Sequence, residues 1–225
     1  SAVSGTFNIL PQNPMSGEIT SDTTWTEANS PYTVTGHVTV ASGVTLTIEP
    51  GVVVKFDGGK CLIVEGGLVV RGSTDKKVTF TSSAASPAAG DWGYIDFKAG
   101  SIETTFDADG NYVSGSILEH SIVEYAGSLP GPVKFIVGGE GGAPYINAST
   151  FNNNVAKTNS GGAVIRDPVK VTNSTITQNP YSTAILAIDY DGPILITGNT
   201  ITYNHTGIHF KNTAAGTTST IARNT

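Results

Sequence analysis

The sequence predicts an all-β solenoid, a parallel β-helix in which three short strands make up each coil. Three observations carry this prediction. A nine-residue pattern recurs at intervals of 25 residues, like residues recur in fixed columns of that pattern, and short segments rich in Val, Ile and Thr end in turn residues. No long segment has the spacing of an amphipathic helix, so strands and tight turns are expected throughout.

The repeat is clearest in the C-terminal half. Three segments share the full pattern, a fourth is partial, and a looser copy precedes them: "INASTFNNN" from Ile146, "VTNSTITQN" from Val171, "ITGNTITYN" from Ile196, "IARNT" from Ile221 and "LEHSIVEYA" from Leu118. Column one is apolar, with Leu118, Ile146, Val171, Ile196 and Ile221. Column four holds Ser121, Ser149, Ser174, Asn199 and Asn224, and column nine holds Asn154, Asn179 and Asn204. Stacked apolar side chains, with Asn and Ser at the bends and Gly where a corner needs positive φ, predict a parallel β-helix.

The N-terminal half has the same elements with less regular spacing. Strand-like runs such as "VTLTI", "VVVKF" and "GLVV" alternate with "EPG", "DGGK" and "GSTDKK". We expect roughly seven or eight coils and a rod about 35–40 Å long, at ~4.8 Å per coil. Residues 1–36 are expected to form an N-terminal cap with Trp25 as a lid, and residues 37–225 the β-helix. Because "STIARNT" stops part-way into a coil, we expect more chain to follow and the last coil to associate end to end or to fray.

Composition limits the function. The 225 residues carry a net charge of −6, with 13% charged residues, which disfavours nucleic acid, anionic membranes and polyanionic glycans as partners. No apolar run approaches the ~18 residues of a membrane span. The lone cysteine, Cys61, excludes an intrachain disulfide, and its apolar run "CLIVEG" predicts a buried, inert thiol.

The chain resembles a known group of proteins. The stretches "SDTTWTEANSPYTVTGHVTVASGVTLTIEPGVVVKF", "LIVEGGLVVRGSTDKKVTFTS", "GDWGYIDF" and "HSIVEYAG" look like the right-handed parallel β-helix repeat proteins of bacterial surfaces. The resemblance covers most of residues 18–225. It implies an adhesin-like, S-layer-associated or carbohydrate-linked scaffold, located outside the cell or on its surface. The architecture is shared more distantly with pectate lyases and polygalacturonases, but a fold does not transfer a function.

One loop has the residues of a metal site. In "DADGNY" the oxygen-bearing side chains of Asp107, Asp109 and Asn111 alternate around Gly110, as in calcium-binding loops. The bidentate glutamate of an EF-hand loop is missing, because Leu118 stands at the twelfth position. Turn formation and Ca²⁺ binding therefore remain the two interpretations. No cofactor is expected to be required.

The best candidates for acid–base catalysis are Asp189 and Asp191 in "DYDGP", with Asp167 one coil earlier and His209 nearby. Paired carboxylates can cleave glycosidic bonds. The "NTD" and "RIK" style signatures of galacturonases are absent, and lyases also need a basic residue among calcium-binding acids. The alternatives are a solvated turn, a ligand contact and catalysis.

Aromatic residues predict a sugar-binding strip, because pyranose faces pack on flat rings. If Ile95 points inward, Tyr94 points outward near Trp92, and later coils add Tyr125, Tyr145 and Tyr203. Packing of these rings against loops is the alternative.

Threonines of the repeat face outward in pairs. Thr175 with Thr177, and Thr200 with Thr202, flank inward isoleucines and form a small T-x-T grid. Such grids occur on ice-binding solenoids, but β-branched residues are also common on any strand surface.

These observations favour a non-catalytic module of a bacterial surface or secreted protein, acting as a stalk, adhesin or polysaccharide-binding scaffold. A polysaccharide lyase or glycoside hydrolase is the alternative, and ice binding is a minor one. An enzyme would gather three or more acids and a basic residue within a few coils, and this chain shows few of these.

Overall fold

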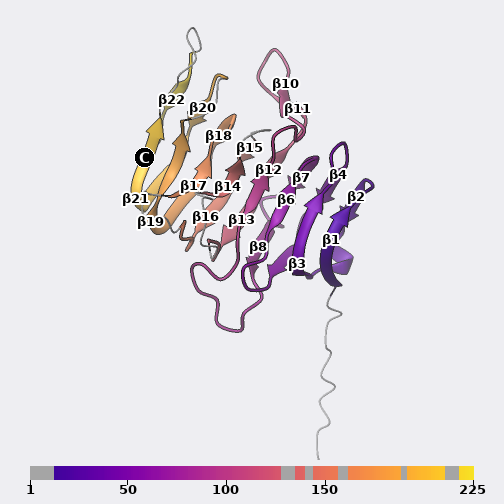
Figure 1. The fold of residues 1–225 in the computed structure, drawn as a ribbon. Coiled ribbons are helices and arrows are strands. Elements are labelled where there is room, and N and C mark those ends of the chain that lie inside the picture. Colours follow the sequence, from indigo (N-terminus) through magenta and orange to yellow (C-terminus); the bar gives the residue numbers. More distant parts are fainter. Residues whose placement is uncertain (1–12, 128–134, 140–143, 157–161, 189–191, 211–217) are drawn as a thin grey trace, which may run out of the picture.

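The computed structural model describes residues 13–127, 135–139, 144–156, 162–188, 192–210 and 218–225. These residues form a parallel β-solenoid of about seven turns, consistent with the predicted right-handed β-helix. Figure 1 shows the strands lying side by side in sequence order along the solenoid, from β1 and β2 to β21 and β22. Among the described residues no helix has the length and apolarity needed to cross a membrane.

Each coil contributes strands to three walls. The first wall is an eight-stranded parallel sheet formed by β2 (Thr23–Trp25), β4 (Thr45–Ile48), β7 (Gly67–Arg71), β12 (Ile117–Glu119), β15 (Tyr145–Asn147), β18 (Lys170–Thr172), β20 (Leu195–Thr197) and β22 (Thr220–Ala222). The second wall contains β1 (Asn13–Ile19), β3 (Tyr32–Val40), β5 (Val53–Phe56), β8 (Val78–Ser82), β13 (Ser121–Glu124), β16 (Thr150–Asn152), β19 (Thr175–Ala187) and β21 (Thr200–Phe210). The third wall contains β6 (Leu62–Val64), β9 (Ile95–Phe97), β14 (Phe135–Gly139) and β17 (Gly162–Arg166), together with the C-terminal parts of the strands β1, β3, β19 and β21. The prediction of three strands per coil is confirmed.

The core is a set of inward ladders in strict register. On the first wall, column one of the repeat stacks Leu118 on Ile146, then Val171, Ile196 and Ile221. The first four of these side chains are fully buried. Each buried aliphatic side chain contributes about 1.5–3 kcal/mol. The apolar column therefore supplies the free energy that holds successive coils together.

Asparagine and serine stack at the bends, as predicted. In column four, Ser149 Oγ accepts from the Ser121 amide at 3.1 Å, and Asn199 Oδ1 accepts from the Ser174 amide at 2.9 Å. In column nine, Asn179 Oδ1 accepts from the Asn154 amide at 2.9 Å. These side chains satisfy backbone donors that the turn removes from the strand ladder.

One corner differs from expectation, because four of its five positive-φ residues are not glycine. The corner between the first and second walls has φ between 47° and 70° at His120, Ala148, Asn173, Gly198 and Arg223. The amide of His120 donates to Asn147 on the next coil at 3.1 Å, and that of Ala148 donates to Thr172 at 3.0 Å. Ladder bonds of this kind offset the strain that a side chain adds in this conformation.

The expected N-terminal boundary falls inside a strand. β1 and β2 pair in parallel with β3 and β4, and β3 runs across residue 36. Trp25 is buried and stacks on Tyr32 with 4.8 Å between ring centroids. Residues 13–36 thus continue the first and second walls, and a cap over residues 1–36 stays a prediction.

Two segments leave the coils. The hairpin of β10 (Thr105–Phe106) and β11 (Tyr112–Ser114) projects from the first wall, and a loop over residues 83–94 joins β8 to β9 at the opposite side of the molecule (Figure 1). One carries the predicted calcium loop, and the other contributes to the groove described below.

Candidate functional site

A second set of positive-φ residues follows the strands of the second wall. Tyr125, Asn153, Gln178 and Tyr203 have φ of 62°, 53°, 57° and 54° and occupy column eight of the repeat. Each follows the same point of successive strands, because Phe151 pairs with Ile176 and Ile176 with Ile201. We call these four residues the turn ladder. Its members lie about one strand spacing apart, ~4.8 Å, along the solenoid axis.

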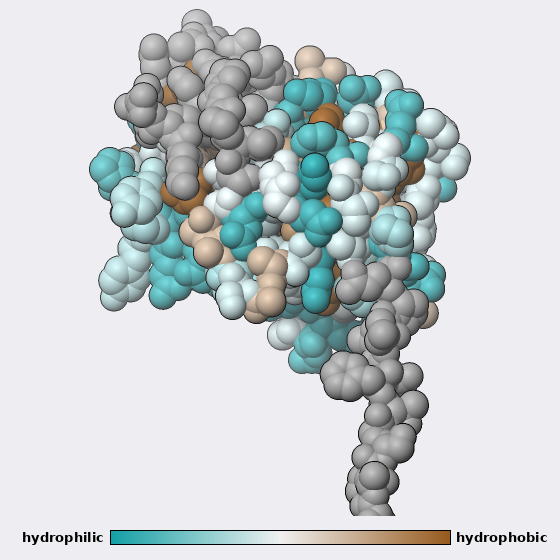
Figure 2. All heavy atoms as spheres, turned by 60° about the horizontal axis from the view of Figure 1, so that its bottom comes forward, coloured by the Kyte–Doolittle hydropathy of each residue, from teal (hydrophilic) through white to brown (hydrophobic). Residues whose placement is uncertain are grey.

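A groove of about 430 Å³ lies along the turn ladder, lined by Ala89, Asn153, Gln178, Pro180 and Tyr203. Tyr203 has 81% of its surface exposed, so one ring of this groove is open to a ligand. Figure 2 looks onto the underside of Figure 1, where polar and intermediate side chains dominate and strongly apolar ones are scattered. The groove thus combines an accessible aromatic ring with two side-chain amides.

The floor of the groove is rigid because a buried asparagine ladder lies directly beneath it. Asn154 Oδ1 accepts from the Ala126 amide at 2.9 Å, and Asn179 Nδ2 donates to Asn204 Oδ1 at 2.8 Å. Asn154 and Asn179 are fully buried. Since each ladder asparagine adjoins a turn-ladder residue in sequence, these bonds fix the positions of the Asn153 and Gln178 backbones.

The 83–94 loop supplies the other side of the groove and is pinned to the turn ladder. The amides of Gly90 and Asp91 both donate to the Tyr125 carbonyl, at 3.1 and 2.9 Å. The Asp91 carboxylate accepts from Ser82 Oγ at 2.7 Å and from the Ala88 amide at 2.9 Å. Ala89 is therefore held against the coils.

Trp92 does not present its ring to solvent, so its predicted place in an exposed sugar-binding strip is wrong and the alternative, packing of the ring, applies. The side chain is 0% exposed and stacks on Phe56, with ring centroids 4.1 Å apart and an interplanar angle of 11°. Its Nε1 donates to the Glu124 carbonyl at 2.7 Å. Trp92 follows a loop rather than lying in a strand, so strand alternation does not set its direction, and burial of its large apolar surface does. It anchors the loop that carries Ala89.

The tyrosines predicted to bind sugar lie in two separate parts of the molecule. Tyr125 and Tyr203 belong to the turn ladder, although Tyr125 is half-buried against the core. Tyr94 instead packs on the third wall against Phe135, with centroids 5.9 Å apart. Burial raises the pKa of Tyr94 to about 12 and that of the buried Cys61 thiol to about 11. Tyr94 and Tyr203 therefore do not form one continuous strip.

Of the candidates for acid–base catalysis, Asp167 and His209 lie among the described residues. Asp189 and Asp191 lie outside them. Asp167 is buried, accepts from Arg166 Nε at 3.0 Å through Oδ2, and accepts from the Ile188 amide at 2.8 Å through Oδ1. Both oxygens thus have structural partners. His209 is exposed on β21 and pairs in register with Leu186.

The "DADGNY" loop forms the tip of the β10–β11 hairpin. Asp107 Oδ1 accepts from the amides of Asp109 and Asn111 at 3.0 and 2.8 Å, and its Oδ2 accepts from Asn111 Nδ2 at 3.0 Å. Hydrogen bonds from the Asn111 side chain and backbone hold the pKa of the exposed Asp107 carboxyl below its usual value. Across the described residues, no cluster of three or more His, Cys, Asp or Glu is placed to hold a metal ion. Calcium binding here stays a prediction.

The hairpin docks on the outer face of the first wall through Lys170. The ammonium group donates to the Gly110 carbonyl at 2.8 Å and lies 4.8 and 4.9 Å from the ring centroids of Phe106 and Tyr145. Desolvation lowers the pKa of Lys170, and the negative charge of Asp107 opposes that change. No pattern in the sequence predicts this docking, which joins residues 60 positions apart.

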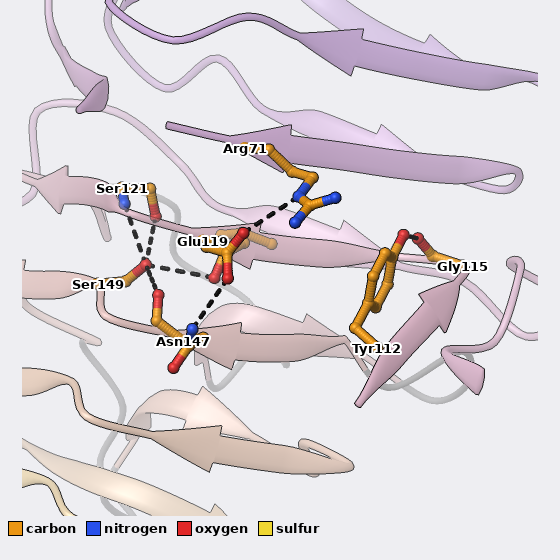
Figure 3. A network of polar contacts seen from close by, with 8 residues as sticks. Arg71, Tyr112, Gly115, Glu119, Ser121, Asn147 and Ser149 are labelled. Carbon is orange, nitrogen blue, oxygen red and sulfur yellow. Dashed lines mark hydrogen bonds and ion pairs between the residues drawn. The ribbon is translucent and has the colours of Figure 1, made fainter. Parts of the chain in front are cut away.

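A polar row runs beside the hairpin (Figure 3). Arg71 Nε donates to Glu119 Oε2 at 3.1 Å, and Asn147 Nδ2 donates to Glu119 Oε1 at 2.9 Å. Tyr112 donates to the Gly115 carbonyl at 2.8 Å, and the Arg71 guanidinium lies 5.5 Å from its ring centroid. These contacts connect three coils and the hairpin base, and they occupy both Glu119 oxygens.

The threonine grid has the predicted register. Thr175 pairs with Thr200 and Thr177 with Thr202, and Thr177 and Thr202 share a hydrogen bond of 3.0 Å between their hydroxyls. The neighbouring coil places Thr150 and Asn152 in the same rows. The grid thus spans two full coils, and its role in binding ice stays a prediction.

Sequence reasoning missed Asn153 and Gln178 as groove residues. The signal was present, because column eight of the repeat carries Tyr, Asn, Gln and Tyr in four consecutive coils. Columns four and nine are small or amide side chains that face inward, whereas column eight varies in size and lies beside them. A variable polar column next to a buried asparagine column marks a turn that points outward.

Comparison with known proteins addresses the architecture. The family model described as the pectate-lyase-like β-helix domain matches residues 17–113. No curated protein and no solved structure matches the chain. The matched segment forms the first coils, and the same parallel register continues through β22. Residues 17–113 are therefore similar to the pectate-lyase-like β-helix domain, and the described residues as a whole share the parallel β-helix fold.

Proposed function

We propose that this chain is a non-catalytic β-helix module of a bacterial surface or secreted protein, which holds a polysaccharide in the groove along the turn ladder. The observation that carries the proposal is the pairing of an exposed ring, Tyr203, with the amides of Gln178 and Asn153 in one groove. The extracellular or cell-surface location belongs to the same proposal.

The chemistry of the groove suits a sugar. A pyranose ring has an apolar face that packs on an aromatic ring, and hydroxyls that need both donors and acceptors. Gln178 and Asn153 each offer a carbonyl oxygen and an NH₂ group. Because the buried asparagine ladder fixes their backbones, less ordering entropy is lost on binding.

The groove lining favours binding over bond cleavage. Glycoside hydrolysis needs two carboxyl groups on either side of the scissile bond, and the lining residues that the structure describes include none. Asp167, the acid candidate that the structure describes, has both oxygens engaged by Arg166 and the Ile188 amide. A scaffold or adhesin role requires binding alone.

Affinity electrophoresis tests the proposal. The chain is run in gels containing a panel of polysaccharides, and retardation is compared for the wild type, Tyr203→Ala and Tyr181→Ala. Tyr181 is the matched control because it is 71% exposed and does not line the groove. We expect retardation that Tyr203→Ala weakens about tenfold and Tyr181→Ala leaves unchanged.

Three results would overturn the proposal. One is the absence of retardation by every polysaccharide in the panel and on a glycan array. Another is turnover in a reducing-end or unsaturated-product assay, lost in Asp189→Ala, which would establish the enzyme alternative. Equal weakening by both tyrosine substitutions would place binding outside the groove and would also contradict it.

A further inference from the structure

Among the described residues, those that line the groove along the turn ladder carry no charged side chain. They are Ala89, Asn153, Gln178, Pro180 and Tyr203. Within three positions of any of them, the sequence contains one acidic residue, Asp91, and one histidine, His205, but neither Lys nor Arg. A polyuronate ligand carries a carboxylate on each sugar and is bound by Arg or Lys, often in bidentate pairs.

Two carboxylates lie near the part of the 83–94 loop that carries Ala89, whereas Lys60 contacts the far end of the loop, where its carbonyl accepts from the Gly93 amide at 2.9 Å. Asp91 sits two residues from Ala89, and its carboxylate is held inside the loop by Ser82 and the Ala88 amide. Glu124 precedes Tyr125 in the turn ladder, and its Oε1 accepts from Thr81 Oγ1 at 2.9 Å. These carboxylates add to the net charge of −6 and repel an anionic polymer, most strongly at low salt.

The direction of the groove follows from the ladder. Asn153, Gln178 and Tyr203 occupy three successive coils, so their side chains recur at ~4.8 Å and span about 10 Å along the solenoid axis. An extended polymer lying parallel to this axis would meet a ring at one end and two amides in sequence. A polymer lying across the axis would meet one of the three.

From this arrangement we infer that the groove takes a neutral polysaccharide, lying along the solenoid axis with one sugar face on Tyr203 and its hydroxyls on Gln178 and Asn153. The inference rests on the proposed function and adds to it the class of glycan and its orientation. Recognition depends on ring stacking and on uncharged amides, so salt should have little effect on affinity.

The test compares neutral and acidic polymers with one set of variants. Gels contain hydroxyethylcellulose, galactomannan or arabinoxylan as neutral probes and polygalacturonate or alginate as polyuronates. We expect at least one neutral probe to retard the wild type, at an affinity that raised salt changes less than about twofold. Gln178→Ala and Asn153→Ala should each weaken retardation several-fold, and Tyr203→Ala about tenfold.

A double variant that adds positive charge to the groove tests whether the uncharged lining selects neutral over acidic glycans. Asn153→Lys together with Gln178→Lys should weaken retardation by the neutral probe and create salt-sensitive retardation by polygalacturonate. Both positions are on the surface of the turn ladder, and thermal melting of each variant checks that it folds.

The outcomes separate this inference from the proposed function. Retardation by polyuronates alone, lost in Tyr203→Ala, would overturn the neutral-glycan inference and leave polysaccharide binding in place. Retardation by neither class would overturn both. Neutral retardation that Asn153→Ala and Gln178→Ala leave unchanged would overturn the axial orientation.

Discussion

Asn179 Nδ2 donates to Asn204 Oδ1 on the next coil at 2.8 Å, and this bond continues a ladder of buried amides beneath the groove. The same Nδ2 lies 3.2 Å from the Phe151 carbonyl, and Asn179 Oδ1 accepts from the Asn154 amide. Asn179 thus connects three coils through one side chain. Its bonds are to backbone groups as well as to another amide, so its removal leaves buried polar atoms without partners.

Asn179→Ala should lower the free energy of unfolding by about 2–4 kcal/mol, because each buried group left unpaired costs about 1–3 kcal/mol. Denaturant unfolding measures this change. Asn152→Ala is the matched control: its buried Oδ1 has no hydrogen-bond partner among the described residues, and we expect a loss below about 1 kcal/mol. Equal losses of unfolding free energy for the two variants would contradict a stabilising role for the buried asparagine column.

Trp92→Ala should destabilise the chain by about 3–5 kcal/mol, since it removes a fully buried ring stacked on Phe56. The exposed Tyr203→Ala should change stability by less than about 0.5 kcal/mol. Thermal melting distinguishes the two. A Trp92→Ala protein that melts like the wild type would show that the ring does not pack in the core.

The calcium hypothesis for Asp107, Asp109 and Asn111 predicts a melting temperature that rises on addition of Ca²⁺ and returns with a chelator. Asp109→Asn should abolish the shift, because it removes one of the loop's two carboxylates. Lys170, whose ammonium group already contacts Gly110, opposes binding of a second cation. An unchanged melting temperature would show that this loop does not bind Ca²⁺.

Cys61 should resist thiol reagents in the native state, because it is buried and its pKa is raised to about 11. The thiolate is the reactive form, so labelling at about pH 8 should be at least ~100-fold slower than in concentrated denaturant. A folded pKa above the unfolded 9.0 means that this group's contribution to stability is present below pH 9.0 and is lost as pH rises towards 11. Cys61→Ala should therefore flatten the fall in unfolding free energy over that interval. Rapid native labelling would contradict the prediction.

The C-terminal edge is the basis for a proposed self-association. In the described part of the chain, β22 pairs with β20 on one side, and Ile221 is 45% exposed at the end of an otherwise buried column. We expect the mass measured by light scattering to rise with protein concentration, and Ile221→Lys to prevent the rise. Val113→Lys, which adds the same charge at an exposed site on the hairpin, is the control. A constant monomer mass for the wild type would refute end-to-end association.

Much of the fold could be predicted from the repeat. A parallel ladder places the same column at the same depth in each coil, so Val171 and Ile196 must both be apolar, and Ser174 and Asn199 must both bond along the ladder. Because of that constraint, similar residue types recur at the same column of each repeat in the sequence. The outward direction of Thr175 and Thr177 followed from the same alternation.

The candidate site was less accessible to sequence reasoning. Trp92 and Lys170 belong to irregular segments, where no period sets the direction of a side chain. Their positions depend on which distant residue they meet, Phe56 for one and Gly110 for the other. Such contacts are fixed by tertiary packing between distant segments, and nothing in the local sequence encodes them.

The sequence by itself determined the β-helix, its coil length and its buried columns, because register between identical coils imposes identical chemistry. Tertiary structure alone decided that Asn153, Gln178 and Tyr203 share a groove with Ala89, a residue 64 positions before the nearest of them. The physical reason is that the Tyr125 carbonyl accepts hydrogen bonds from two amides of the 83–94 loop, and these bonds hold the loop against the turn ladder.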